Sequence, residues 1–87
     1  MEIEKIRIND PNGLHLRRAA EVVKSCKKYL SKIHLCYNCK IADTCSILQV
    51  LGLAAPCNSE VAVIAEGPDE KKAAMEIAGL FSQGGGI

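Results

Sequence analysis

The fold of this chain is decided by residues 16–43, LRRAAEVVKSCKKYLSKIHLCYNCKIAD, where the spacing of apolar residues changes from helical to strand-like. In the first half, apolar side chains recur every three or four residues, which predicts a helix with one buried stripe. In the second half they alternate with polar ones on both sides of Asn38-Cys39, which predicts a β-hairpin. The predicted helical stripe comprises Leu16, Ala19, Ala20, Val23, Cys26 and Leu30, and the inward side of the next strand Ile33, Leu35 and Tyr37.

Shorter elements are predicted before and after this stretch. An Ile-rich strand is expected over residues 2–8, followed by a turn over 9–13, NDPNG, where turn-forming residues cluster. Ser46 is a good N-cap for a short helix over 47–51, which Gly52 is expected to close. Val61, Val63 and Ala65 are the expected inward side of a fourth strand, and Pro68-Asp69-Glu70 opens a last helix with the stripe Ala73, Ala74, Ile77, Leu80 and Phe81.

The resulting order is strand, helix, strand, strand, helix, strand, helix. Such an order predicts an α+β open-faced sandwich, in which amphipathic helices cover one face of a sheet. The chain has 87 residues, enough for a single domain over 1–87, and residues 84–87 are expected to form a frayed tail.

Charge and composition exclude several classes of function. The formal net charge is only +1, which argues against general nucleic-acid binding. The N-terminus has no secretory pattern, and no stretch reaches the length of a membrane span, so no membrane partner is expected. The five cysteines are an odd number, which favours reduced thiols in a cytoplasmic protein over a disulfide framework.

His15 is the candidate for chemistry. It lies between the turn over 9–13 and the predicted helix, so its imidazole is expected among the exposed first-turn amides. A lone histidine near a turn is more often a surface or capping residue. Here the helix dipole favours a neutral, nucleophilic ring, and Arg17 or Arg18 would meet a phosphate attached to it.

The string around His15 decides between these interpretations. Residues 12–20, NGLHLRRAA, resemble the active-site signature of the HPr family, the histidine phosphocarriers of the bacterial sugar phosphotransferase system. Ser46-Ile47 and Gly67-Pro68-Asp69-Glu70 are similar to two further family motifs, and the spacing from His15 to Ser46 matches. The resemblance implies a four-stranded antiparallel sheet covered on one face by three helices.

The resemblance also implies the role of each site residue. His15 would accept a phosphoryl group on Nδ1 from Enzyme I and pass it to an EIIA-type acceptor, while Arg17 steadies the phosphate. Leu16 and Arg18 would complete the phosphate-binding positions, and Ser46 corresponds to a serine that a dedicated HPr kinase modifies in some bacteria. No cofactor is expected in this chain, because phosphoenolpyruvate and Mg²⁺ belong to the donor. The implied apolar docking residues are Ile47, Leu48 and Leu51.

The sequence departs from the family pattern at five positions. Leu16 and Arg18 stand where Ala and Pro are usual, and Cys39, Ala54 and Asn58 stand where Gly is usual. The first two changes leave an alternative function open, a diverged HPr-like regulatory binding module without efficient phosphotransfer.

Two further patterns suggest binding surfaces. Arg17, Ala20, Lys24 and Lys27 share one helical face, which predicts a flat basic patch for an acidic partner. On the bare side of the sheet, Ala62, Ile64, His34 and Cys36 are expected to point outward, with Ile3 beside them. This partly apolar cluster suggests a weak homodimer.

Cys36 and Cys39 have the spacing of half a zinc site or of a redox pair, with Cys45, Cys57 and His34 as further candidate ligands. A single pair is a weak signal, and no helix begins after Cys36 to lower its pKa. Structural thiols are therefore favoured over a metal or redox module, and no metal site is assigned.

Overall fold

The computed structural model describes residues 1–82, so the frayed tail predicted at 84–87 lies outside the described residues. Seven elements follow one another in the predicted order. They are β1 (Glu2–Arg7), α1 (Leu16–Cys26), β2 (Lys32–Tyr37), β3 (Lys40–Asp43), α2 (Ile47–Gly52), β4 (Glu60–Glu66) and α3 (Glu70–Ser82). Among residues 1–82, no helix is long and apolar enough to cross a membrane.

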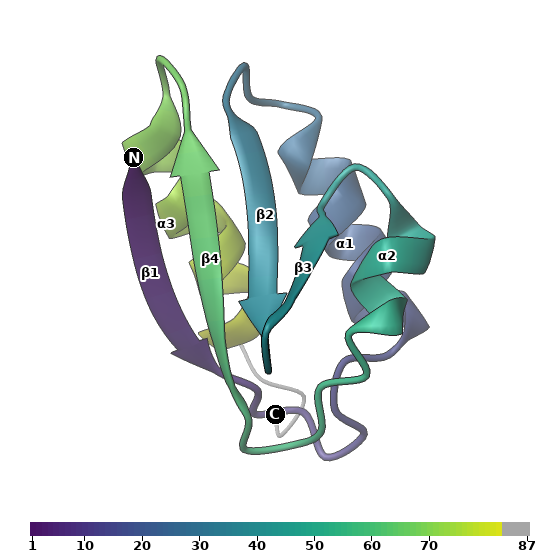
Figure 1. Ribbon diagram of the computed structural model, residues 1–87. Helices are drawn as coiled ribbons and strands as arrows, with labels where there is room; N and C mark the ends of the chain where they lie inside the picture. Colours follow the sequence, from purple (N-terminus) through teal and green to yellow (C-terminus); the bar gives the residue numbers. More distant parts are fainter. Residues whose placement is uncertain (83–87) are drawn as a thin grey trace.

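The strands form one antiparallel sheet in the order β1-β4-β2-β3 (Figure 1). Helix α3 packs on β1, β4 and β2, α1 lies beside α3, and α2 contacts α1 and β3 at the edge of the sheet. The helices thus leave the opposite face of the sheet open, as Figure 1 shows from that side. This arrangement confirms the predicted α+β open-faced sandwich.

The core fills the space between the sheet and the helices. Ile33, Leu35, Val61, Val63 and Ala65 point inward from β2 and β4 and are at most 3% exposed, as the alternation predicts. Tyr37 is only half-buried. The last helix contributes its predicted stripe, with Ala73, Ala74, Ile77 and Phe81 buried and Leu80 half-buried against them.

The predicted stripe of α1 is partly wrong. Its buried residues are Ala19, Val22, Ser25 and Cys26, whereas Leu16 is 63% and Leu30 84% exposed. The helix ends at Cys26, so the helical spacing no longer governs where Leu30 points. Ala20 is also exposed, and Val23 is only half-buried. The buried arc is therefore rotated toward Val22 and uses the small side chains of Ala19 and Ser25.

Within residues 1–82, four non-glycine residues have left-handed backbone conformations. Asn38 (φ 50°) and Cys39 (φ 66°) form the two-residue turn of the predicted β2–β3 hairpin, in which both central residues need positive φ. Ala54 (φ 53°) and Asn58 (φ 73°) are the other two. All three positions where the resemblance leads one to expect Gly are thus left-handed, and only Asn58 is a residue that tolerates this region well.

Helix α2 begins as predicted and ends differently. The Ser46 hydroxyl accepts a hydrogen bond from the Gln49 N–H at 3.3 Å, which confirms Ser46 as the N-cap. Gly52 does not close the helix, because it is the last helical residue and its φ is not positive. The chain turns away two residues later, at the left-handed Ala54.

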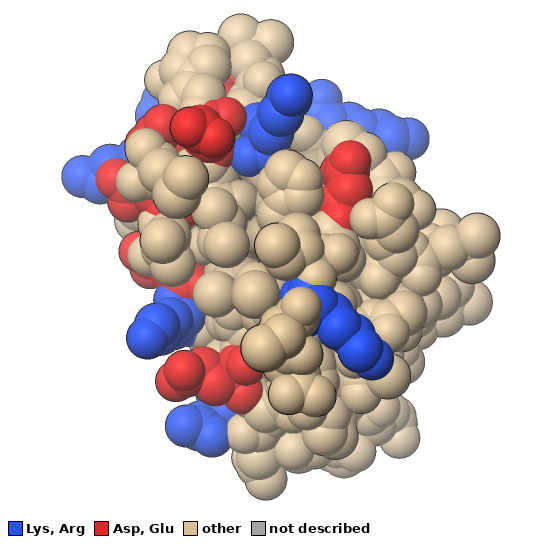
Figure 2. All heavy atoms as spheres, viewed as in Figure 1, with Lys and Arg blue, Asp and Glu red and all other residues tan. Residues whose placement is uncertain are grey.

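The open face of the sheet is partly apolar. Strand register places Ile64 between Ile3 and His34, and Ala62 next to Cys36, so the predicted outward residues are neighbours. The exposed Ile41 joins them opposite Cys36. In Figure 2, which views this face, uncharged residues occupy its centre and charged side chains lie mostly around them.

A partly buried group of hydrogen bonds joins the α1–β2 connection to the start of α3. The Asp69 carboxylate accepts hydrogen bonds from the Leu30 N–H (3.0 Å), the Ser31 N–H (2.9 Å) and the Ser31 hydroxyl. Gly67 is required here, because a Cβ on it would lie 2.6 Å from the Ser31 Cα and its φ is 153°. The Ser31 hydroxyl, followed by the Leu30 amide, lowers the pKa of Asp69.

We predict that Asp69→Asn reduces the free energy of unfolding at pH 7 and flattens its dependence on pH. A carboxyl with a depressed pKa in the folded state stabilises the protein above its unfolded pKa of about 3.9. That contribution is lost as the pH falls through the folded pKa. Urea unfolding between pH 7 and pH 2 measures it, with the exposed Glu4→Gln as control. Parallel curves for the wild type and Asp69→Asn would contradict the assignment.

Candidate functional site

The loop between β1 and α1 holds the start of α1 in place. The Gly13 N–H donates to the Asp10 carbonyl at 2.9 Å and closes a tight turn. Gly13 has φ 71°, and a Cβ there would lie 2.7 Å from the Ala55 carbonyl oxygen, so this close approach needs glycine. Leu14 then donates its N–H to the same Ala55 oxygen at 2.8 Å and buries its side chain. These contacts fix the direction of the chain at His15, where the loop enters α1.

His15 is the N-cap residue of α1, where the sequence predicts it. Its backbone is extended (φ −113°, ψ 176°), and its carbonyl accepts the first helical hydrogen bond, from the Ala19 N–H at 3.0 Å. The imidazole makes no capping hydrogen bond to the helix, so it does not compete for the first-turn amides. Those N–H groups have no partner within the helix and make its first turn a site for an anion.

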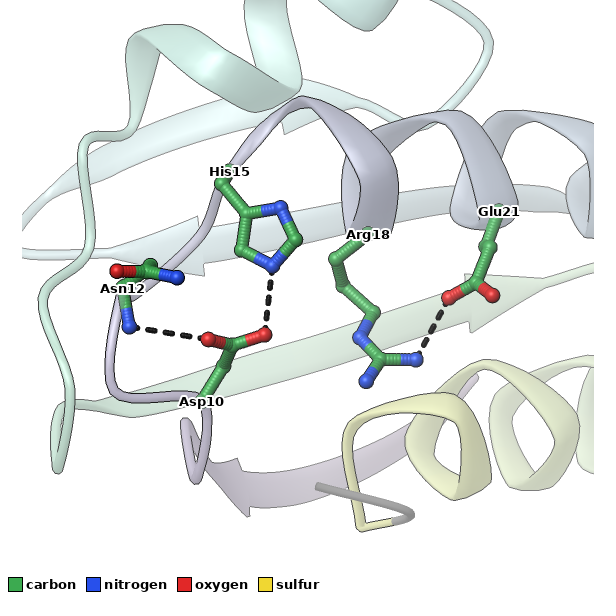
Figure 3. Close-up of polar contacts among 5 residues, drawn as sticks. All are labelled: Asp10, Asn12, His15, Arg18 and Glu21. Atoms are coloured by element: carbon green, nitrogen blue, oxygen red, sulfur yellow. Dashed lines mark hydrogen bonds and ion pairs between the residues drawn. The ribbon is translucent and has the colours of Figure 1, made fainter. Parts of the chain in front are cut away.

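Asp10 orients the imidazole. Its Oδ2 lies 2.6 Å from Nε2 of His15, and its Oδ1 accepts the Asn12 N–H at 2.9 Å (Figure 3). The side chains of Asp10 and His15 are 12% and 30% exposed, so the pair is largely shielded from water. The Asn12 amide, then His15, and to a lesser extent the charge of Arg18, lower the pKa of Asp10.

The tautomer of His15 follows from this contact. An ionised carboxylate only accepts hydrogen bonds, so Nε2 of His15 must carry the proton. In the neutral ring the lone pair is then on Nδ1, which lies on the side of the ring facing α1 in Figure 3. When the ring is neutral, the site therefore places a nitrogen lone pair beside the backbone donors of the first turn.

The two arginines after His15 have different surroundings. Arg17 is exposed and has no ion pair among residues 1–82. Arg18 is 13% exposed in its side chain, and its Nη1 lies 2.6 Å from Oε1 of Glu21 (Figure 3). Leu16, the third predicted phosphate-binding residue, follows His15 in the chain, and its side chain is exposed. Their roles toward phosphate stay predictions.

The predicted docking residues lie on two adjoining helices. Helices α1 and α2 contact each other, as Figure 1 shows at the right of the molecule. Ala20 and Lys24 on α1 and its C-cap residue Lys27 are exposed. On α2, Leu48 is 79% exposed, and Ile47 and Leu51 are half-buried beside it. Ser46 is half-buried at the start of this second group.

The cysteine candidates do not gather into a metal site. Cys36 lies in β2 and Cys39 in the β2–β3 turn, and all five cysteines are free thiols. Within residues 1–82, no group of three His, Cys, Asp or Glu side chains is arranged to hold a metal ion.

Two features of the structure are absent from the sequence-based predictions. One is the contact of Asp10 with His15, for which the only sequence signal was the position of Asp10 in the turn before His15. The other is a contact between Cys26 and Cys45, two residues that belong to no common motif.

Comparisons with known proteins show the family and the fold of this chain. Residues 3–83 match the family model described as "PTS HPr component phosphorylation site". The phosphocarrier protein HPr of Buchnera aphidicola subsp. Schizaphis graminum is 36% identical over 80 residues, covering 92% of this chain and 94% of the relative. The crystal structure of HPr from Thermoanaerobacter tengcongensis superposes with a TM-score of 0.89 at 30% identity, covering 95% of this chain and 93% of that one. A structure of the same protein described as a dimer gives a TM-score of 0.75 at 30% identity and covers 95% of each chain.

We predict that Asp10→Asn changes the tautomer of His15. An amide can donate to Nε2, which would move the ring proton toward Nδ1, so the Nε2–H form should lose its dominance. Nitrogen-15 NMR of the imidazole at a pH where the ring is neutral measures the two forms. Glu21→Gln, which removes only the partner of Arg18, is the matched control. An unchanged tautomer ratio in Asp10→Asn would contradict the role of Asp10.

Proposed function

This chain belongs to the HPr family of phosphocarriers, and we propose that it accepts a phosphoryl group from Enzyme I on Nδ1 of His15 and passes it to an EIIA-type acceptor. The observation that carries the proposal is the pairing of His15 Nε2 with Asp10 at the start of α1. It leaves Nδ1 as the nucleophilic nitrogen, beside a group of donors suited to phosphate. The chain is then a carrier in a relay, not an enzyme acting alone.

Each transfer exchanges one bond to phosphorus for another. The Nδ1 lone pair attacks the phosphorus presented by Enzyme I, and the bond to the donor's leaving group breaks with its electron pair. The phosphorylated ring, still protonated on Nε2, carries positive charge, which the Asp10 carboxylate stabilises at 2.6 Å. In the second transfer the acceptor attacks the same phosphorus, and Nδ1 leaves as a neutral ring nitrogen. No cofactor or metal held by this chain is needed.

The first turn of α1 supplies the groups that would hold the phosphate. Backbone amides at Leu16 and the following positions face the anion, and the guanidinium of Arg17 is available because it is exposed and without an ion pair among the described residues. Arg18 contributes its backbone N–H. Its side chain adds a second cation to the phosphate only by releasing Glu21.

Partner docking is proposed on α1 and α2. The apolar side chains of Ile47, Leu48 and Leu51, together with Ala20, would form the contact, and Lys24 and Lys27 would complement an acidic surface on Enzyme I or an EIIA-type protein. Ser46, as the N-cap of α2, is the proposed target of an HPr kinase. We assign the protein to the cytoplasm, with no nucleic-acid or membrane partner.

The alternative is a regulatory binding module that keeps the docking surface and transfers phosphate poorly. The exposed Leu16, which follows His15 in the chain, and the engagement of Arg18 by Glu21 are the observations that favour it. A weak homodimer through the open face of the sheet is compatible with either function, because that face is formed by strands and His15 lies at the start of α1.

We predict that His15→Ala abolishes labelling by Enzyme I and radiolabelled phosphoenolpyruvate while leaving the thermal unfolding midpoint nearly unchanged. The imidazole is partly exposed and makes no capping hydrogen bond to the helix. Its loss therefore removes the nucleophile but little of the packing. The other histidine of the chain gives the control, since His34→Ala should be labelled like the wild type. Label retained by His15→Ala would disprove transfer through this residue. A wild type that binds Enzyme I but stays unlabelled would favour the binding module.

We predict that Ser46→Asp weakens binding to Enzyme I roughly tenfold, an effect of about 1.4 kcal/mol. A partner that covers Leu48 must desolvate the new charge, which also faces an acidic surface. The same charge at a helix start stabilises the fold by about 0.3–1 kcal/mol. Ser46→Asn, a neutral N-cap, is the matched control for calorimetric titration. Equal affinities for the two variants would remove α2 from the docking surface.

A further inference from the structure

Two cysteines that share no sequence motif are in contact in the folded protein. Sγ of Cys26 lies 3.4 Å from Sγ of Cys45, although the residues are 19 positions apart. Cys26 is the last residue of α1, and Cys45 directly precedes the N-cap of α2. No other pair of thiols in residues 1–82 is hydrogen-bonded, and this includes Cys36 and Cys39, the pair that the sequence singled out.

We propose that Cys26 and Cys45 form a reversible disulfide that links the end of α1 to the start of α2. The proposal does not depend on phosphate transfer at His15, because neither cysteine belongs to the candidate site at the other end of α1. It assigns a modification site to residues that the proposed function leaves unused.

Hydrogen bonds hold the chain around both cysteines. Thr44, fully buried beside Cys45, donates its hydroxyl to the Ile33 carbonyl at 2.9 Å. The Cys45 N–H donates to Oδ1 of Asp43 at 2.8 Å. Cys26 is 4% exposed, and its thiol is directed at the Val23 and Thr44 carbonyls, at 3.1 and 3.4 Å. A disulfide needs an S–S distance of about 2.05 Å. Closing the remaining gap requires movement mainly of the exposed Cys45 side chain.

The pair is also accessible to a small oxidant. A surface pocket with a volume of about 440 Å³ is lined by both cysteines and, among others, by Asp43 and His34. The pKa of the Cys45 thiol is raised above its ordinary value, first by the hydrogen bond between Cys45 and Cys26 and then by burial. The Cys45 sulfur is therefore a thiol at neutral pH, and its oxidation is expected to be slow, since the thiolate is the reactive form.

Hydrogen peroxide is the oxidant for this disulfide. One peroxide oxidises the Cys45 sulfur to a sulfenic acid and is reduced to water. The Cys26 sulfur then attacks the Cys45 sulfur, the S–O bond breaks, and the hydroxyl leaves as a second water with the Cys26 proton. The balance is two thiols and one peroxide to one disulfide and two waters. A dithiol reductant reverses the modification by exchange.

The test uses a full-length variant that keeps only these two cysteines, with Cys36→Ser, Cys39→Gly and Cys57→Ser. Glycine suits position 39 because its φ is 66°. The folded variant is treated with hydrogen peroxide, alkylated and digested, and mass spectrometry maps any linked peptides. We expect a Cys26–Cys45 link and an unfolding midpoint higher by roughly 10 °C, both reversed by dithiothreitol. Adding Cys45→Ser to the variant should abolish the link and the shift.

The wild type, with all five thiols, provides the second measurement under the same treatment. A dominant Cys26–Cys45 link there supports the proposal. Three results would overturn it: both thiols remaining open to alkylation in the treated variant, a link that forms only in urea, or a wild type in which Cys36, Cys39 or Cys57 takes the place of either residue.

Discussion

The hydrogen bond from the Leu14 N–H to the Ala55 carbonyl joins the two loops on which the candidate site depends. Gly13 makes this approach possible, and the burial of Leu14 keeps water from competing with the bond. A second bond between the same loops, from the Asn58 N–H to the Ile8 carbonyl at 2.7 Å, holds the end of β1 against the start of β4. Because both loops are fixed by the sheet, α1 begins at one defined residue, Leu16, and His15 is its N-cap.

The orientation of the His15 ring comes from the loop and its electrostatic surroundings from the helix. One oxygen of the Asp10 carboxylate accepts the Asn12 N–H, and the other contacts Nε2 of His15. The turn thus positions the carboxylate without a contact from the helix backbone. The first turn of α1 then places unpartnered amides around the other side of the ring. The proposed transfer uses both parts, because Asp10 defines the tautomer of the ring and the helix start offers donors to an incoming phosphate.

Periodicity in the sequence was sufficient for the elements and for most of the core, because alternation along β2 and β4 and the stripe of α3 depend on local spacing alone. It misplaced the buried side of α1, since counting apolar residues to Leu30 ignores that the helix ends at Cys26 and that Ala19 and Ser25 allow close packing. His15 could be placed because it adjoins a turn and a helix start. The contact between His15 and Asp10 depends on how the turn folds, and the contact between Cys26 and Cys45 depends on how α1 and α2 meet. Neither contact can therefore be recognised from a local sequence pattern.

The change from the usual proline to Arg18 acts differently at the backbone and at the side chain. Proline has no N–H, so arginine adds a donor to the first turn, where helical amides have no intrahelical partner. Its guanidinium, however, is paired with Glu21 at 2.6 Å and largely buried. Drawing it toward an anion beside His15 would break that pair and leave the Glu21 carboxylate without this partner. The substitution therefore adds a neutral backbone donor to the candidate site, and Arg17, exposed and without an ion pair in the described part of the chain, is its immediately available cation.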